Sequence, residues 1–144
     1  MTSHACCTIP PVVTTDYVPK GAYETHGGLK AYVTGSTSTS TTGVVYIYDI
    51  FGYFSQTLQG ADIIAAAGNH LVVMPDVLLG SFSDPANFPA DTPEKRKALG
   101  EFFAGPANQT KAVENVRKVA DALKVEYPGV GKWAIIGLCW GGKV

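Results

Sequence analysis

Short apolar segments alternate with amphipathic ones along most of the chain, and this alternation restricts the possible folds more than any other feature. Each apolar segment is four or five residues long and rich in Val, Ile, Leu and Tyr, as buried strands are. The sequence predicts strands at 29–33, 44–48, 71–74 and 133–136, and helices at 55–68, 92–103 and 108–127. Strands that alternate with helices favour an α/β fold, in which a mostly parallel sheet is covered by helices on both faces.

Capping signals mark the ends of the predicted helices. Ser55 can cap the first helix, and Gly68 ends it. Thr92-Pro93-Glu94 gives the second helix a cap residue, a first-turn proline and a first-turn acid. The third helix has one apolar stripe that must pack on another element: Val113, Val116, Ala120 and Leu123. The loop from Pro75 to Asp91 is rich in glycine, proline and asparagine, and loops of this length are often functional.

Composition and charge exclude two kinds of partner. The 144 residues are 46% hydrophobic and 16% charged, which is typical of an ordinary globular domain. Eleven basic and twelve acidic residues give a net charge of -1, without a basic run that could neutralise a line of phosphates. No nucleic-acid partner is therefore expected. No apolar run approaches the roughly 20 residues that span a bilayer, so no membrane partner is expected either.

The N-terminus and the cysteines favour a cytoplasmic location. Residues 1–11 lack the basic start and the apolar stretch of a secretory signal. The chain has three cysteines, and two of them, Cys6 and Cys7, are adjacent, which does not resemble a framework of disulfides. Two thiols near a chain end are too few for a structural zinc site, and no metal or other cofactor is expected.

The strongest chemical signal is the segment Gly137-Leu138-Cys139-Trp140-Gly141-Gly142, directly after the last predicted strand. A nucleophile between glycines at this point is typical of a nucleophile elbow, a sharp turn that lifts a reactive side chain above a sheet. Cys139 would be the nucleophile, and Gly137 and Gly141 would allow a close approach that a β-carbon forbids. The backbone N–H of Trp140 would then face the oxyanion that forms when a thiolate attacks an ester or lactone.

Other interpretations of this segment stay open. The run from Gly137 to Lys143 also matches a phosphate-binding loop, although Val144 stands where a nucleotide loop needs Ser or Thr to hold magnesium. Alternatively, Cys139 is a small buried residue at a tight turn, as unpaired cysteines often are. In that case the chain would be a non-catalytic fragment or a module that binds a small molecule.

Three blocks of sequence together resemble one known family. Tyr48-Asp49-Ile50-Phe51-Gly52, Met74-Pro75-Asp76 and the segment 137–142 each follow a predicted strand. In this order they are similar to the dienelactone hydrolase family of the α/β-hydrolase fold. The opening Cys6-Cys7-Thr8-Ile9-Pro10-Pro11 and the segment Gln59-Gly60-Ala61-Asp62 resemble the fungal branch in particular.

The resemblance implies a Cys-His-Asp triad that hydrolyses small esters or lactones without a cofactor, in a protein that is monomeric at full length. On this pattern Cys139 is the nucleophile, and the backbone N–H of Ile50 is a second oxyanion donor beside that of Trp140. Asp49 matches a family acid, usually glutamate, that holds the resting thiol. Such an acid would disfavour a neighbouring thiolate, and aspartate is one methylene shorter. Asp49 could instead only cap the turn.

The chain departs from the family pattern in its substrate-binding block. Bacterial members carry an arginine shortly after the proline and aspartate of the second block, where it binds the substrate carboxylate. Here Val77-Leu78-Leu79-Gly80 follows, without an arginine. A broader preference for small esters or lactones is therefore expected, and Asp76 is expected to be a turn residue.

The triad acid and base should follow the nucleophile in the α/β-hydrolase order. His4, His26 and His70 all precede it, and we expect them at the surface or at an edge. Residues 1–144 therefore resemble the N-terminal part of a single domain that ends just after the elbow, with the C-terminal strands and helices missing. Without the acid and the base, we expect this chain to be inactive by itself.

Overall fold

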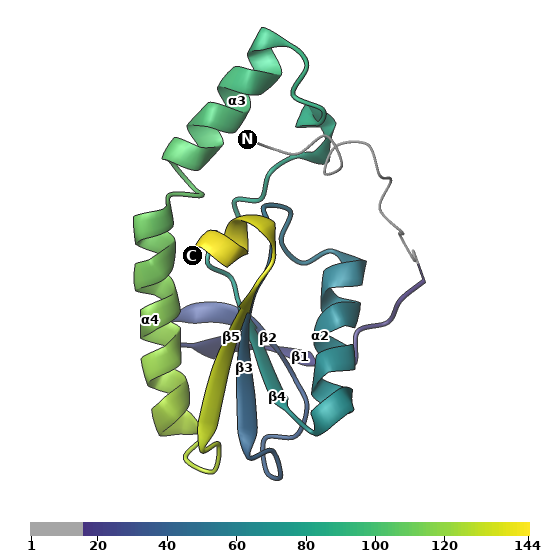
Figure 1. The fold of residues 1–144 in the computed structure, drawn as a ribbon, viewed down its shortest axis with the longest axis vertical. Helices are drawn as coiled ribbons and strands as arrows, with labels where there is room; N and C mark the ends of the chain where they lie inside the picture. The colour runs from purple at the N-terminus through teal and green to yellow at the C-terminus, as the bar shows by residue number, and fades with distance from the viewer. Residues whose placement is uncertain (1–15) are drawn as a thin grey trace.

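The predicted alternation produces a five-stranded sheet between helices, as Figure 1 shows for the described part of the chain. The computed structural model describes residues 16–144, so His4, Cys6, Cys7 and the rest of the opening segment lie outside it. The strands are β1 (Ala22–His26), β2 (Leu29–Thr34), β3 (Thr42–Ile47), β4 (Leu71–Pro75) and β5 (Lys132–Gly137). The helices are α2 (Ser55–Gly68), α3 (Pro93–Ala104) and α4 (Gln109–Glu126), with short 3-10 helices η1 (Pro85–Asn87) and η2 (Cys139–Lys143).

The sheet is mixed, with the strand order β1-β2-β4-β3-β5. β3 pairs in parallel with β4 and β5, whereas β1 with β2 and β2 with β4 are antiparallel pairs. β1 carries no signal in the sequence, because four of its five residues are exposed and no apolar run marks it. Gly27 and Gly28 join it to β2 with φ values of 58° and 81°, as a two-residue hairpin turn requires.

The hydrophobic core is built around β3 and β4. Residues 43–47 and 71–75 are all buried, whereas no residue of β5, at the edge of the sheet, is buried. Because β3, β4 and β5 are parallel, their carboxyl ends lie at the same end of the sheet. The loops that follow these strands are therefore brought together, which is where open α/β sheets bind their ligands.

The helix ends and faces agree with the prediction in part. Thr92 caps α3 as predicted, since its hydroxyl accepts a hydrogen bond from the Lys95 N–H at 3.3 Å. The prediction for Ser55 is wrong, because Phe54 occupies the cap position of α2 without a side-chain bond. The buried stripe of α4 is rotated from the predicted one: Ala112, Val116, Val119 and Leu123. None of the helices described in 16–144 has the length and hydropathy to cross a bilayer.

Candidate active site

The turn after β5 has the backbone of a strained, exposed corner. The N–H of Leu138 donates to the Ile47 carbonyl at 3.0 Å, which continues the pairing of β5 with β3 by one residue. Cys139 then adopts a φ of 52°, in the left-handed region that costs a non-glycine residue about 1–2 kcal/mol. The Cys139 side chain is an exposed free thiol. The chain therefore bends sharply at this cysteine and leaves its sulfur accessible.

Two glycines allow η2 to fold back onto the sheet. A β-carbon on Gly137 would overlap the backbone carbonyl of Gly141. A β-carbon on Gly141 would lie 2.5 Å from the Tyr48 carbonyl oxygen and 2.6 Å from that of Ile47. Both neighbours are backbone atoms, which cannot rotate away as a side chain can. The turn after β5 thus packs directly against the start of the loop after β3.

Trp140 anchors η2 through its side chain. The residue is 4% exposed, and its indole Nε1 donates to the Ala107 carbonyl at 3.0 Å. Ala107 precedes α4 and is itself buried. The bond satisfies a donor that would otherwise be buried without a partner, and it fixes η2 against the connection between α3 and α4. The Trp140 N–H lies in the first turn of η2, where helix N–H groups have no partner within the helix.

The buried side chain of Tyr48 anchors the start of the loop after β3. This side chain is fully buried, its hydroxyl donates to Asp76 Oδ1 at 2.5 Å, and it accepts a bond from the Leu78 N–H at 3.3 Å. Burial, together with the bond to the Asp76 carboxylate, raises the pKa of Tyr48, so that the hydroxyl stays protonated and donates. Asp76 is therefore more than the turn residue expected from sequence, because its buried carboxylate ties the loop after β4 to the loop after β3.

Asp49 and Ile50 directly follow Tyr48 in the loop after β3. The Asp49 carboxylate accepts the Phe51 N–H at 2.9 Å, within its own turn. Burial raises the pKa of Asp49, and the N–H groups of Phe51 and Gly52 oppose this by stabilising the charged form. Ile50 is 6% exposed, and its carbonyl accepts the Ser83 N–H at 2.9 Å. The loop is thus fixed at Asp49 by its own backbone and at Ile50 by the loop after β4.

Neither histidine of the described residues lies in this arrangement. His26 lies on the edge strand β1, one of the two places expected for it, but it is only 4% exposed and pairs with Glu126 and with Glu24. His70 Nδ1 bonds the Thr42 hydroxyl. Thr42 begins β3 opposite Lys132, whereas Ile47 lies opposite Gly137, so a strand rise of about 3.3 Å per residue separates the two ends by roughly 16 Å. His70 therefore lies at the opposite end of the strands from Cys139.

Comparisons with known proteins agree on one family. The profile of the dienelactone hydrolase family matches residues 29–144. An uncharacterised AIM2 family protein of Schizosaccharomyces pombe is 35% identical over 84% of this chain and 48% of its own length. A Zea mays protein named endo-1,3;1,4-beta-D-glucanase is 38% identical over 82% of this chain and 34% of its own. A carboxymethylenebutenolidase homolog of Xenopus tropicalis is 30% identical over 100% of this chain and 56% of its own.

Solved structures share the fold at lower identity. One, named m3DLH, superposes with a TM-score of 0.56 at 21% identity and covers 85% of this chain and 50% of that one. A dienelactone hydrolase-like promiscuous phosphotriesterase from metagenomic libraries gives a TM-score of 0.52 at 20% identity, with 85% and 49% coverage. The chain spans between about a third and somewhat over half of the curated relatives it matches. Its α/β-hydrolase-type sheet and the family profile over residues 29–144 show that this chain belongs to the dienelactone hydrolase family.

Proposed function

We propose that this chain carries the nucleophile and the oxyanion donors of a hydrolase that cleaves small carboxylic esters or lactones. The observation that supports it most is the exposed Cys139 thiol at a positive φ, on a turn that packs against the Ile47 and Tyr48 carbonyls, directly before Asp49 and Ile50. A strained backbone at an exposed nucleophile is typical of an active site. The membership of the dienelactone hydrolase family supports the same chemistry.

The proposed reaction has two steps. The Cys139 thiolate attacks the carbonyl carbon of the ester, and the tetrahedral oxyanion is stabilised by the N–H groups of Ile50 and Trp140. Collapse of this intermediate breaks the carbon–oxygen bond and leaves the acyl group on sulfur as a thioester, and the leaving alcohol takes up the proton that the thiol had given to the general base. Water then attacks the thioester carbonyl, releases the carboxylic acid and restores the thiol. In a lactone the alcohol and the acid remain one molecule.

Asp49 is the proposed guard of the resting thiol. Burial raises the pKa of its carboxyl, so the group becomes protonated, and therefore uncharged, at a higher pH than an exposed aspartate does. A neutral Asp49 can accept or donate a hydrogen bond beside the thiol, whereas a charged one opposes the thiolate. The contact with the Phe51 N–H is the competing role, in which Asp49 only shapes the turn.

The general base and its orienting acid are proposed to lie outside residues 16–144. His26 is engaged by Glu24 and Glu126, and His70 lies at the opposite end of the strands. The chain alone should therefore not turn over, because loss of a triad histidine costs several powers of ten in rate. A reducing, cytoplasmic location would keep the thiol free to react.

An esterase assay tests the proposal. The substrate is an aryl acetate, and the proteins are this chain and a form extended at its C-terminus with the later strands and histidine of the family. We expect turnover only in the extended form, with a loss of at least a thousand-fold in kcat/KM for Cys139→Ala. Turnover that survives Cys139→Ala would overturn the assignment of the nucleophile. An extended form that folds but shows no turnover would favour a non-catalytic binding module.

A further inference from the structure

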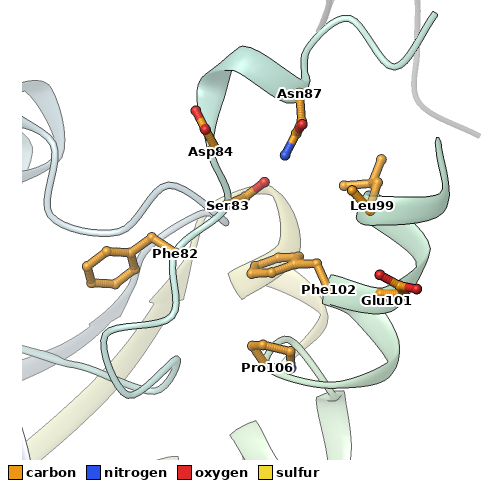
Figure 2. A pocket seen from close by; sticks show the side chains of 9 residues that line it. Phe82, Ser83, Asp84, Asn87, Leu99, Glu101, Phe102 and Pro106 are labelled. Atoms are coloured by element: carbon orange, nitrogen blue, oxygen red, sulfur yellow. The ribbon is translucent and has the colours of Figure 1, made fainter. Parts of the chain in front are cut away.

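A pocket of about 370 Å³ lies between the loop after β4 and helix α3. Its walls are largely apolar and come from Phe82 on the loop, Leu99 and Phe102 on α3, and Pro106 beyond it. Figure 2 shows the Phe102 ring in the middle of this lining, with Leu99 above it and Pro106 below. A cavity of about 150 Å³ lined by apolar side chains takes a benzene molecule, so this pocket has room for a phenyl-sized group.

The pocket is joined to both residues proposed as oxyanion donors. Ser83, one of its walls, donates its N–H to the Ile50 carbonyl at 2.9 Å. On the other side, the indole of Trp140 donates to the carbonyl of Ala107, the neighbour of the wall residue Pro106. The pocket therefore lies one hydrogen bond away from each of the residues that carry the two donors. This location suits the part of an ester that extends away from its reacting carbonyl.

Two neutral polar groups point into the pocket. Figure 2 shows the Ser83 hydroxyl and the Asn87 amide directed toward the space in front of Leu99 and Phe102. Ser83 is only 7% exposed. A hydroxyl and an amide can each donate to and accept from a ligand, which suits an ether, amide or hydroxyl substituent.

The charged residues of the lining are both acidic. Asp84 accepts the Ala86 N–H at 2.8 Å as the cap of η1, and Glu101 pairs with Lys97 at 3.8 Å. In Figure 2 both carboxylates point outward at the rim. No lysine, arginine or histidine belongs to the lining formed by the described residues. Lys97 already pairs with Glu101, so the rim offers a carboxylate no free cation beside its two acids, and Val77-Leu78-Leu79-Gly80 supplies no arginine.

We propose that this pocket is a substrate subsite for an uncharged aromatic group and that its acidic rim excludes substrates that carry a carboxylate. The inference rests on the proposed hydrolase function, because only that function gives the pocket a substrate to select. It assigns the chain to neutral aryl or arylalkyl esters and lactones. The repulsion acts through solvent at the rim, so added salt should weaken the discrimination.

Binding of two small probes to this chain tests the subsite. The probes are 2-phenylacetamide and phenylacetate, which share their shape and differ in charge. We expect the amide to bind at least ten-fold more tightly, with backbone amide shifts in NMR spectra confined to the pocket walls. Equal affinity for the two probes, or shifts that map elsewhere, would overturn the proposal.

Variants locate the source of the discrimination. Asp84→Asn combined with Glu101→Gln should raise the affinity for phenylacetate at least three-fold, whereas Glu94→Gln, at the far end of α3, should leave it unchanged. Phe102→Ala should weaken the binding of both probes, provided that the circular dichroism of the variant matches the parent. An unchanged ratio of affinities in the double variant would contradict the role of the rim.

The binding assay separates this inference from the proposed function. Neither probe has a cleavable ester, so binding does not depend on the thiol, and Cys139→Ala should bind both as the parent does. If the extended form loses no esterase activity on Cys139→Ala, the nucleophile is wrong while the subsite can still hold. If Cys139 proves to be the nucleophile but the amide does not bind in the pocket, the subsite alone is wrong.

Discussion

β3 and β5 are neighbouring parallel strands, and each is followed by one half of the candidate site, yet their surroundings differ sharply. The residues from Val44 to Ile47 are at most 6% exposed, whereas Ile135 on β5 is 62% exposed. The loop after β3 is held by the buried Tyr48 and Asp76. The elbow after β5 is held by the backbone of β3 and by the Trp140 indole. The position of Cys139 thus depends on the contacts of its neighbours Leu138 and Gly141 with Ile47 more than on the burial of its own strand.

The largest effect is expected where the elbow meets β3. Gly141→Val places a branched side chain against the Tyr48 and Ile47 carbonyls, so η2 must move away. Overpacking of this kind costs about 3 kcal/mol, and here both neighbours are backbone. Urea unfolding of the two proteins measures the loss. Gly129→Val, in the turn before β5, is the control, because nothing lies within 4 Å of the β-carbon that it would carry, and it should be nearly neutral. Equal stability of the two variants would contradict the close contact.

Truncations compare the two strands directly. Val45→Ala on β3 removes methyl groups from a site that is 1% exposed and should cost about 2 kcal/mol. Ile135→Ala on β5 removes more atoms but should cost less than about 0.5 kcal/mol, because the side chain is 62% exposed. Midpoints of urea unfolding measure both. A larger loss from Ile135→Ala would show that β5 is covered in solution.

Loss of the Tyr48 hydroxyl, which anchors the loop after β3, should lower the free energy of unfolding by a smaller amount. Tyr48→Phe leaves the Asp76 carboxylate and the Leu78 N–H without their partner and should cost about 1.5 kcal/mol. Tyr53→Phe, which removes a bond to the Met74 carbonyl at 2.9 Å, is the matched control and should cost about 1 kcal/mol. Thermal unfolding distinguishes the two. A neutral Tyr48→Phe would mean that Asp76 does not hold the loop.

Most of the elements, but not the contacts between them, could be predicted from sequence. The strands β2 to β5 and the helices carry local apolar patterns, and the glycines around Cys139 mark a turn. The bond between Tyr48 and Asp76 joins residues 28 apart in sequence, and each is an ordinary strand or turn residue in its own segment. His26 has no local signal either, because its partner Glu126 lies 100 residues away. Such pairs are set by packing, which no short pattern encodes.

The smallest effect is expected at Asp49, and it depends on pH. Burial raises the pKa of this carboxyl in the folded protein, so its contribution to stability is fully present below its ordinary pKa of 3.8. That contribution is lost as the pH rises through the raised value. Asp49→Asn, which keeps an oxygen for the Phe51 N–H, should therefore be slightly more stable than the parent at pH 7 and equal to it near pH 3. Urea midpoints across this range test the sign, and a variant less stable at pH 7 would contradict it.

Acetyl transfer to the folded chain tests the central claim, that the elbow presents a reactive Cys139, most directly. The chain is treated with an aryl acetate at neutral pH, and the acetylated peptides are counted by mass spectrometry, with the peptide of Cys6 and Cys7 as an internal reference. We expect Cys139 to be acetylated faster than the reference in the folded chain, and urea or Gly141→Val to remove this advantage. A Cys139 that reacts no faster than the reference in the folded chain would contradict it.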